Sequence, residues 1–288
     1  MNIVTCSYGN PVGEHIREIL NGNMVNVIIK KFPDGEIYLR IVDELKPDVP
    51  VIIINTTINT EAVLEMAFAI DAVKRFHVKK IIAVTPYFGY GRQDKQFLPG
   101  EAISASVIAR MLTDGVSDFI MVEPHSDYIK NYFDCKVHIV SAASAIFEKF
   151  KDKIDLVVSP DKGGIGRAAT VGKLLNTQYT YLNKKRISSY EVAMEFTDNI
   201  SMNGKRILIV DDLVSTGGTI IKASELIKKA GALEIHVACT HGLFIDNSGY
   251  KISRVVDSLN TTDTVQTPYS TIPISKYIAR SIEKAVDS

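Results

Sequence analysis

The chain has 288 residues, of which 46% are hydrophobic, and its 33 Lys and Arg residues balance 33 Asp and Glu residues. This length predicts two domains, although one large domain also fits. Because the net charge is zero, the composition argues against a nucleic-acid-binding protein that works through a general positive field. The longest apolar runs, such as 51–54, are far shorter than the roughly 20 residues of a membrane span, so no membrane partner is expected.

The amino-terminal residues and the cysteines indicate a cytoplasmic protein. Residues 1–4 enter a strand pattern directly and show no signal peptide. Cys6, Cys135 and Cys239 are odd in number, widely spaced and without metal-site spacing, which favours small buried side chains. We therefore expect a reducing, cytoplasmic location.

Short apolar strands alternate with helical patterns along the chain, which is typical of α/β folds. A boundary is expected between 141 and 155 and divides the chain into domains at 1–145 and 146–288 with the same architecture. The first series predicts strands at 3–6, 25–29, 51–54, 80–85 and 118–122, and helices at 60–76 and 102–113. The second predicts strands at 156–159, 180–182, 207–210, 235–239 and 255–257, and helices at 164–175, 219–231 and 274–286.

Polar clusters follow several strands of the first half, where parallel sheets bind ligands. Phe-Pro-Asp-Gly-Glu at 32–36 predicts a hairpin tip, and the alternation after it predicts a strand that could take part in a subunit contact. Tyr-Gly-Arg-Gln-Asp at 90–94 combines an aromatic ring that can stack on a base with Arg92, which can pair with phosphate. His125 ends the strand at 118–122 and suits a metal or an anion, or else a surface position.

Two clusters of the second half carry further candidates. Ser-Pro-Asp-Lys-Gly-Gly at 159–164 places Asp161 before a helix, where it could cap that helix or hold magnesium. The cationic run 184–186 opens some twenty residues of weak periodicity, which predicts either a mobile flap over polyphosphate or a solvated face.

Residues 207–219 carry the strongest signal in the chain. An apolar strand is followed by the adjacent carboxylates Asp211 and Asp212, a loop of Ser215, Thr216, Gly217, Gly218 and Thr219, and then a helix. Backbone N–H groups and hydroxyls at such a helix start suit a phosphate, and the carboxylates suit sugar hydroxyls or a hydrated metal ion. The string predicts a site for a phosphorylated sugar.

Together with Lys-Lys-Arg at 184–186 and Thr-His-Gly-Leu-Phe at 240–244, these motifs resemble the ribose-phosphate diphosphokinase family over essentially the whole chain. The resemblance implies two tandem α/β domains of phosphoribosyltransferase type I, each a mainly parallel sheet flanked by helices, of which only the second keeps the ribose-phosphate loop. It implies the reaction of ATP with ribose 5-phosphate to give 5-phosphoribosyl 1-diphosphate and AMP, with Mg²⁺ as cofactor. In the family an Asp commonly stands where this chain has Glu123, and an acid often stands at the position of Ser215. These departures resemble the archaeal branch.

The resemblance also implies roles for individual residues. Residues 215–219 would hold the 5-phosphate, with Asp211 and Asp212 on the ribose hydroxyls. Lys184 and Arg186 would be catalytic and neutralise charge, with Arg186 also reaching ribose 5-phosphate, and His125 and Asp161 would contact magnesium. ATP would meet Phe32, Asp34, Gly35 and Glu36 of a neighbouring subunit of a homo-oligomer, and Arg92, Gln93 and Asp94. Lys95, Asp127 and His241 are secondary candidates. Two alternatives remain: a phosphoribosyltransferase that consumes the diphosphate, and a non-catalytic regulatory homologue.

Overall fold

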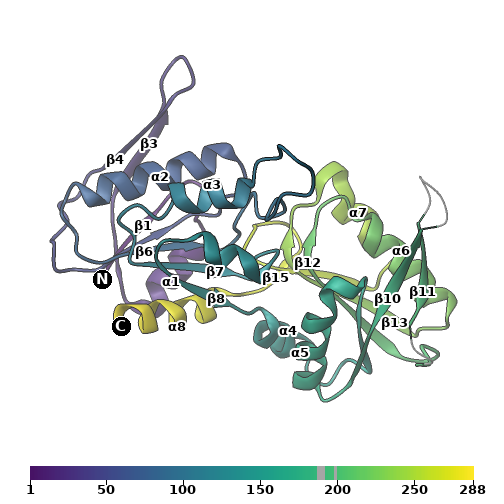
Figure 1. Ribbon diagram of the computed structural model, residues 1–288. Coiled ribbons are helices and arrows are strands. Elements are labelled where there is room, and N and C mark those ends of the chain that lie inside the picture. Colours follow the sequence, from purple (N-terminus) through teal and green to yellow (C-terminus); the bar gives the residue numbers. More distant parts are fainter. Residues whose placement is uncertain (187–191, 198–199) are drawn as a thin grey trace. The chain divides into compact units, whose positions relative to one another are not determined.

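The computed structural model describes residues 1–186, 192–197 and 200–288. The chain forms two compact units (Figure 1). The first comprises Met1–Ser141 and Ile274–Ser288, and the second comprises Ala142–Pro273. Each unit has its own sheet and its own apolar core. Within the described ranges, no helix combines the length and hydropathy of a membrane span.

The first unit is built on a six-stranded parallel sheet in the order β2-β1-β5-β6-β7-β8. Every residue of the central strands β5, β6 and β7 is buried, as expected of parallel strands covered on both faces. The strands are β1 (Asn2–Thr5), β2 (Asn23–Met24), β5 (Val51–Ile54), β6 (Ile81–Thr85), β7 (Asp118–Val122) and β8 (Lys136–Val140).

Helices cover both faces of this sheet. The helices α2 (Thr60–Lys74) and α3 (Ser104–Met111) share one core cluster with inward residues of the strands. The helices α1 (Val12–Leu20) and α8 (Ser275–Val286) contact each other, and α8 also contacts β7 and β8. A short 3₁₀ helix, η1 (Asp127–Tyr132), follows β7. An antiparallel hairpin of β3 (Val27–Lys31) and β4 (Ile37–Ile41) projects beside α2 (Figure 1).

The second unit has a seven-stranded sheet in the order β11-β10-β9-β12-β13-β14-β15, parallel except for the β10–β11 pair. Its strands are β9 (Leu156–Ser159), β10 (Gln178–Arg186), β11 (Val192–Phe196), β12 (Arg206–Val214), β13 (Glu234–Gly242), β14 (Ser258–Thr262) and β15 (Ser270–Ile272). Its helices are α4 (Ala143–Phe150), η2 (Lys162–Gly164), α5 (Ile165–Leu175), α6 (Gly218–Lys229), η3 (Ile245–Asn247) and α7 (Ser248–Ser253). α4 packs against α5, and α6 packs against α7.

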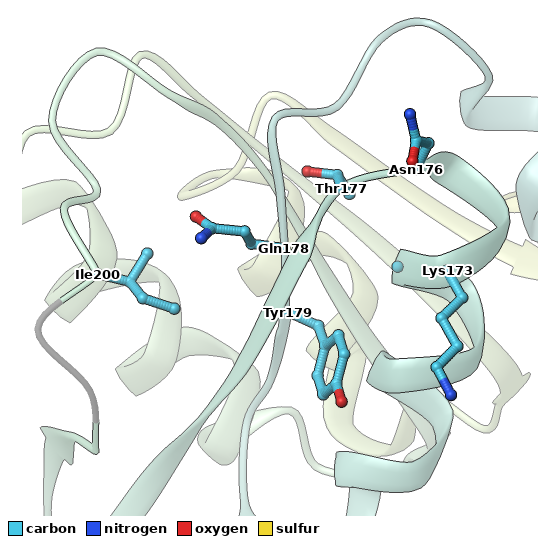
Figure 2. Close-up of a pocket in the computed structure, with 7 residues that line it drawn as sticks. Lys173, Asn176, Thr177, Gln178, Tyr179 and Ile200 are labelled. Carbon is cyan, nitrogen blue, oxygen red and sulfur yellow. The ribbon is translucent and has the colours of Figure 1, made fainter.

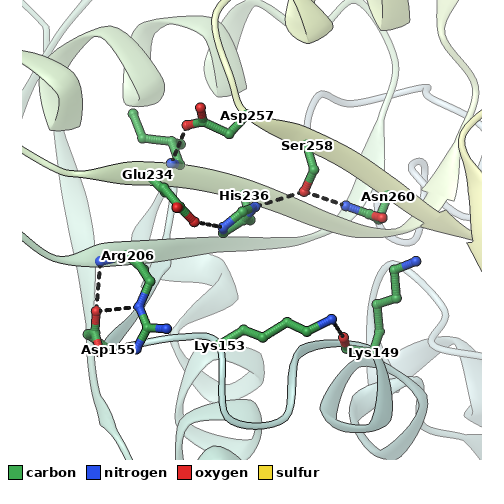
Figure 3. A network of polar contacts seen from close by, with 10 residues as sticks. Lys149, Lys153, Asp155, Arg206, Glu234, His236, Asp257, Ser258 and Asn260 are labelled. Atoms are coloured by element: carbon green, nitrogen blue, oxygen red, sulfur yellow. Dashed lines mark hydrogen bonds and ion pairs between the residues drawn. The ribbon is translucent and has the colours of Figure 1, made fainter.

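Polar side chains tie together the amino ends of the strands in this second sheet (Figure 3). The guanidinium of Arg206 donates from Nε and Nη2 to the two oxygens of Asp155, at 3.0 and 2.8 Å. These bonds lower the pKa of the Asp155 carboxyl to about 2. His236 lies between Glu234 and Ser258, with ring nitrogens 2.9 and 2.8 Å from their oxygens, and so links β13 to β14.

Several predicted boundaries differ from the observed ones. The predicted domain 146–288 included the last helix, whereas Ile274–Ser288 belongs to the first unit, where α8 packs on α1. The predicted strand at 255–257 is wrong, because α7 ends at Ser253 and the strand begins at Ser258. The strands predicted at 180–182 and 207–210 are longer and reach Arg186 and Val214. Cys6 and Cys239 are buried and Cys135 is half-buried, and all three are free thiols.

Candidate active site

The loop at 215–217 joins β12 to α6 in the second unit, as predicted for the phosphate site. Gly217 adopts φ of 75°, a left-handed conformation that favours glycine. A Cβ there would lie 2.9 Å from Cδ1 of Ile252 and 3.2 Å from Cβ of Ser248. Both the backbone conformation and the lack of space therefore disfavour a larger residue. At Gly218, by contrast, a Cβ would meet nothing within 4 Å. The first turn of α6 therefore starts beside open space, where its N–H groups can meet an anion.

Residues that follow β13 fix the backbone of this loop. The carbonyl oxygen of Ser215 accepts hydrogen bonds from Oγ of Ser248 at 2.6 Å and from the backbone N–H of Ile245 at 3.0 Å. The carbonyl oxygen of Val214 accepts from the N–H of Leu243 at 2.9 Å. The turn is thus held in place by the η3–α7 segment, and Thr216 stays exposed.

Asp211 and Asp212 lie within β12 rather than after it, because the strand continues to Val214. Successive side chains of a strand point to opposite faces, yet the N–H of Asp212 donates to Oδ1 of Asp211 at 3.0 Å. Burial and the neighbouring charge of Asp212 raise the pKa of the Asp211 carboxyl well above its usual range. This pair of carboxylates therefore costs stability when both are ionised.

Arg167, to which the sequence assigned no role, is a cation that lies beside this pair. Its Nη1 lies 3.5 Å from Oδ1 of Asp212 and 4.0 Å from Oδ1 of Asp211, and it partly offsets the rise in the pKa of Asp211. It is placed in the first turn of α5, directly after the predicted Ser-Pro-Asp-Lys-Gly-Gly loop. The only sequence signal for Arg167 was its position shortly after the predicted loop at 159–164.

Asp161 caps the short helix η2, which was one of its two predicted roles. Its Oδ1 accepts hydrogen bonds from the N–H groups of Gly163 at 3.0 Å and Gly164 at 3.3 Å. Its charge also contributes to the raised pKa of Asp211, so the two carboxylates interact electrostatically across the site. Gly164 packs closely, since a Cβ there would lie 2.4 Å from Oγ of Ser159.

The described side chains do not by themselves form a metal cage. Within the described ranges, no group of three or more His, Cys, Asp or Glu side chains is placed to hold a metal ion. The predicted metal contacts also belong to different units: His125 to the first and Asp161 to the second. Magnesium does not require such a cage, because it commonly uses one or two carboxylates together with water and substrate phosphates.

The predicted adenine contacts form the tip of the β3–β4 hairpin in the first unit. Phe32, Asp34, Gly35 and Glu36 are all exposed, and the tip is closed by a hydrogen bond from the N–H of Gly35 to the carbonyl of Phe32 at 2.9 Å. The Phe32 ring packs edge-on against Tyr38, with centroids 5.8 Å apart. The hairpin prediction is confirmed, and the nucleotide role of its tip stays a prediction.

Two cavities lie away from the loop at 215–217. In the first unit, a cavity of about 540 Å³ lies between the hairpin and α2, and its lining includes Gly35 and Glu36 together with Lys31, Glu61 and Phe68. In the second unit, a cavity of about 530 Å³ lies where β10 begins, lined by residues that include Lys173, Thr177 and Tyr179 (Figure 2). This second cavity is at the amino end of the sheet, whereas Asp211 lies toward the carboxyl end.

The remaining predicted nucleotide residues lie in a loop of the first unit. Arg92 is exposed, and Gln93 and Asp94 are half-buried. Oη of Tyr132 donates to the carbonyl oxygen of Asp94 at 2.7 Å, which fixes the backbone there. The ammonium of Lys95 lies 5.2 Å from the centroid of the Phe97 ring.

The two histidine candidates and Asp127 have different surroundings. His125 and Asp127 are exposed near the end of β7. His241 is buried in β13, and its Nδ1 lies 2.8 Å from Oγ1 of Thr264, so it serves the interior of the sheet.

The backbone of the predicted flap at 184–186 differs from the expected loop. Lys184 and Arg186 lie in β10 and pair with Met194 and Val192 of β11, so the cationic run belongs to an antiparallel strand pair rather than to a loop. The side chains of 184–194 and the backbone at 187–191 lie outside the described residues. The catalytic roles of Lys184 and Arg186 therefore stay predictions.

The comparisons with known proteins agree with this arrangement. A family model for the N-terminal domain of ribose phosphate pyrophosphokinase matches residues 1–115, and a phosphoribosyl transferase domain model matches residues 128–271. A ribose-phosphate pyrophosphokinase of Pyrococcus abyssi is 38% identical over 277 residues, covering 94% of this chain and 96% of the relative. A second, from Thermoplasma volcanium, is 34% identical over 283 residues and covers 98% of each chain.

A solved structure extends the agreement to the fold. The crystal structure of phosphoribosylpyrophosphate synthetase from Mycobacterium smegmatis matches with a TM-score of 0.86 at 26% identity, over 99% of this chain and 98% of that one. The predicted fold, with tandem α/β domains of phosphoribosyltransferase type, is thereby confirmed. The full-length matches and the loop that joins β12 to α6 lead to one assignment: this chain belongs to the ribose-phosphate pyrophosphokinase family.

Proposed function

We propose that this chain transfers the β,γ-diphosphoryl group of ATP to O1 of ribose 5-phosphate. The sugar 1-hydroxyl attacks the β-phosphorus, the bond from that phosphorus to the bridging oxygen of the α-phosphate breaks, and AMP leaves. The observation that carries the proposal is the joining of Asp211 and Asp212 to the glycine loop at 217–218, in a chain whose two halves both match this family.

The second unit supplies the acceptor half of this reaction. The open first turn of α6, with Thr216 and Thr219, would receive the 5-phosphate, while Asp211 and Asp212 hold the ribose hydroxyls. Hydrogen bonds from hydroxyls would stabilise the ionised carboxylates, whose proximity is otherwise costly. Such transfers depend on in-line placement and charge neutralisation more than on covalent catalysis.

The donor set also fits magnesium. Asp161, Asp211 and Asp212 each offer carboxylate oxygens, of which one or two, with water and substrate phosphates, would suffice for Mg²⁺. A divalent cation would also offset the burial and the neighbouring charge of Asp212 that raise the pKa of Asp211. When bound, the ion would neutralise charge on the polyphosphate. His125 stays a predicted magnesium contact, and Lys184 and Arg186 would add positive charge near the transferred group.

One assay tests the reaction. The purified protein should release AMP from ATP only when ribose 5-phosphate and Mg²⁺ are both present, with 5-phosphoribosyl 1-diphosphate formed in equal amount. Omission of each component in turn is the control. Absence of AMP from the complete mixture would refute the proposal, and release of ADP instead would indicate an ordinary phosphoryl transfer.

The same assay separates the alternatives. A phosphoribosyltransferase would consume added 5-phosphoribosyl 1-diphosphate with a nucleobase and would ignore ATP. A non-catalytic homologue would bind the nucleotide without turnover. Neither alternative is favoured, because the matched relatives span nearly the whole chain and carry the synthetase description.

We further propose a cytoplasmic homo-oligomer in which the exposed hairpin tip of one subunit completes the adenine site of the next. Supporting this, Phe32 and Glu36 are exposed at the tip of a projecting hairpin (Figure 1). Co-assembly of Glu36→Ala with Asp212→Ala subunits should restore part of the activity that each variant lacks alone. No gain above the sum of the separate variants would contradict a shared site.

A further inference from the structure

One carboxylate, that of Glu101, organises the loop that carries Gln93. Its Oε2 accepts hydrogen bonds from the N–H of Phe97 at 2.8 Å, from the N–H of Leu98 at 2.9 Å and from Nε2 of Gln93 at 3.2 Å. The N–H of Glu101 donates in turn to the carbonyl of Leu98 at 3.2 Å. All of these residues belong to the first unit, and neither composition nor spacing singled out Glu101.

These contacts fix which way round the Gln93 amide lies. Its Nε2 donates to Oε2 of Glu101 and also to the carbonyl oxygen of Lys95 at 3.0 Å. A carbonyl and an ionised carboxylate are acceptors only, so a reversed amide would place Oε1 against two acceptors. The N–H groups of Leu98 and Phe97 lower the pKa of the Glu101 carboxyl, which keeps it ionised at neutral pH.

The other end of the amide is therefore an acceptor of fixed orientation. Among the hydrogen bonds of the described residues, none uses Oε1 of Gln93. The backbone of Gln93 is also anchored, because its carbonyl oxygen accepts from the N–H of Ala105 in α3 at 3.2 Å. An anchored acceptor can reject a ligand that presents a second acceptor at the same point.

We propose that Glu101 is a positioning residue that locks Gln93 with its acceptor toward the nucleotide and so selects a base bearing an amino group over one bearing an oxo group. The inference deepens the proposed function and rests on it, since it places Gln93 at the nucleotide. ATP presents an exocyclic N–H donor, whereas GTP presents a carbonyl at the corresponding ring position.

The test is Glu101→Gln, which keeps the shape and offers an NH₂ group that lets the Gln93 amide turn round. We expect the KM for ATP to rise and the ATP-over-GTP ratio of kcat/KM to fall, each by about tenfold, the scale of one hydrogen bond. The KM for ribose 5-phosphate and the kcat with saturating ATP should stay within about twofold of the wild type. Glu14→Gln, which changes an exposed carboxylate on α1, is the matched control and should alter none of these.

A second variant makes the inference independent of how well the first one folds. Gln93→Leu removes the acceptor and should lower the ATP-over-GTP ratio directly, and Glu101→Gln should add no further loss of that ratio in the Gln93→Leu background. Independent losses in the two backgrounds would show a merely structural role for Glu101 and overturn the inference. An unchanged ratio in both single variants would overturn it as well.

Calorimetric titration with ATP and with GTP separates this inference from the proposed function. If the wild type binds ATP in preference to GTP and Glu101→Gln loses that preference, the inference holds even when no AMP forms. If the wild type makes AMP but the variant keeps its preference, the inference fails alone.

Discussion

Asp155 and Asp211 lie toward opposite ends of the same parallel sheet, and their surroundings shift the pKa of the two carboxyls in opposite directions. Asp155, at the amino end, meets the forked guanidinium of Arg206 and has a pKa of about 2 (Figure 3). Asp211, toward the carboxyl end, is half-buried beside the like charge of Asp212, so its pKa is raised. One carboxylate is satisfied by its protein partners, while the other is held in a state that a ligand would improve.

The two ends of the sheet thus have different tasks. At the amino end, Glu234, His236 and Ser258 complete one another's hydrogen bonds and join neighbouring strands. At the carboxyl end, Gly218 opens onto space and like charges are brought together, which costs stability. Substitutions at the amino end should therefore change stability, and substitutions at the carboxyl end should change activity.

The largest effect is expected at Lys184 in β10, compared with Lys173 of α5, which lines the cavity beside the start of β10. Lys184→Ala should lower turnover by on the order of a hundredfold, the scale of losing a transition-state charge contact, with much smaller changes in substrate KM. Lys173→Ala, at the amino-end cavity (Figure 2), is the matched control and should leave turnover unchanged. Steady-state kinetics of both variants decide the point, and equal losses would remove Lys184 from its proposed role.

Asp211→Asn should separate activity from stability. The kcat/KM for ribose 5-phosphate should fall by about tenfold to a hundredfold, because a charged hydrogen-bond acceptor is lost. The unfolding free energy should rise by about 1 kcal/mol at neutral pH, because one of two neighbouring charges is removed.

The pH dependence of Asp211→Asn has a definite sign. A carboxyl with a raised pKa in the folded state destabilises the protein increasingly as the pH rises above its unfolded value of about 3.9. The stabilising effect of the substitution should accordingly grow from acidic toward neutral pH in denaturant titrations. A variant less stable than the wild type at neutral pH would contradict the account.

Two adjacent glycines give a smaller and sharper contrast. Gly217→Ala should destabilise the protein by about 1–2 kcal/mol, because φ of 75° is left-handed and the new Cβ meets Ile252. Gly218→Ala should leave stability almost unchanged, since its Cβ points into open space, yet should raise the KM for ribose 5-phosphate. Thermal unfolding and kinetics of the pair provide the measurement, and a normal KM in Gly218→Ala would place the phosphate elsewhere.

The smallest effect concerns Asp155. A depressed pKa contributes stability above the unfolded value, and that stability is lost as the pH falls from about 4 to 2. Because the side chain is 38% exposed, solvent screening limits the contribution to about 1 kcal/mol. Asp155→Asn should lose this acid-dependent increment in urea titrations and keep wild-type kinetics. A reduced kcat of Asp155→Asn at neutral pH would contradict the assignment of stability to the amino end of the sheet and activity to the carboxyl end.

The sequence revealed the parallel sheets because their central strands are continuous apolar runs, such as 118–122, which the structure places at the same residues. The prediction ended strands too early where polar side chains continue them. Asp211 and Asp212 led it to miss the last residues of β12, and the cations at 184–186 led it to miss those of β10. Their backbones are held by pairing with distant strands, which local periodicity does not register.

The candidate site followed the same rule. The clustering of polar motifs after strands predicted the loop at 215–217 and its carboxylates, because strand ends meet at one edge of a parallel sheet. Arg167 and Glu101 were not predicted. Arg167 contacts a carboxylate that is distant in the sequence, and Glu101 contacts residues of a loop that folds back onto it. Single charged residues of this kind carry no signature until the fold brings their partners close.

The return of α8 to the first unit has a consequence for synthesis on the ribosome. The second unit, Ala142–Pro273, is inserted between two segments of the first, and its last residue is synthesised before Ile278 and Ile282 are added. Until then, the surface of α1 that α8 later covers stays uncovered. The later half of the chain can therefore finish folding first, and the earlier half waits for its last helix to close over the sheet.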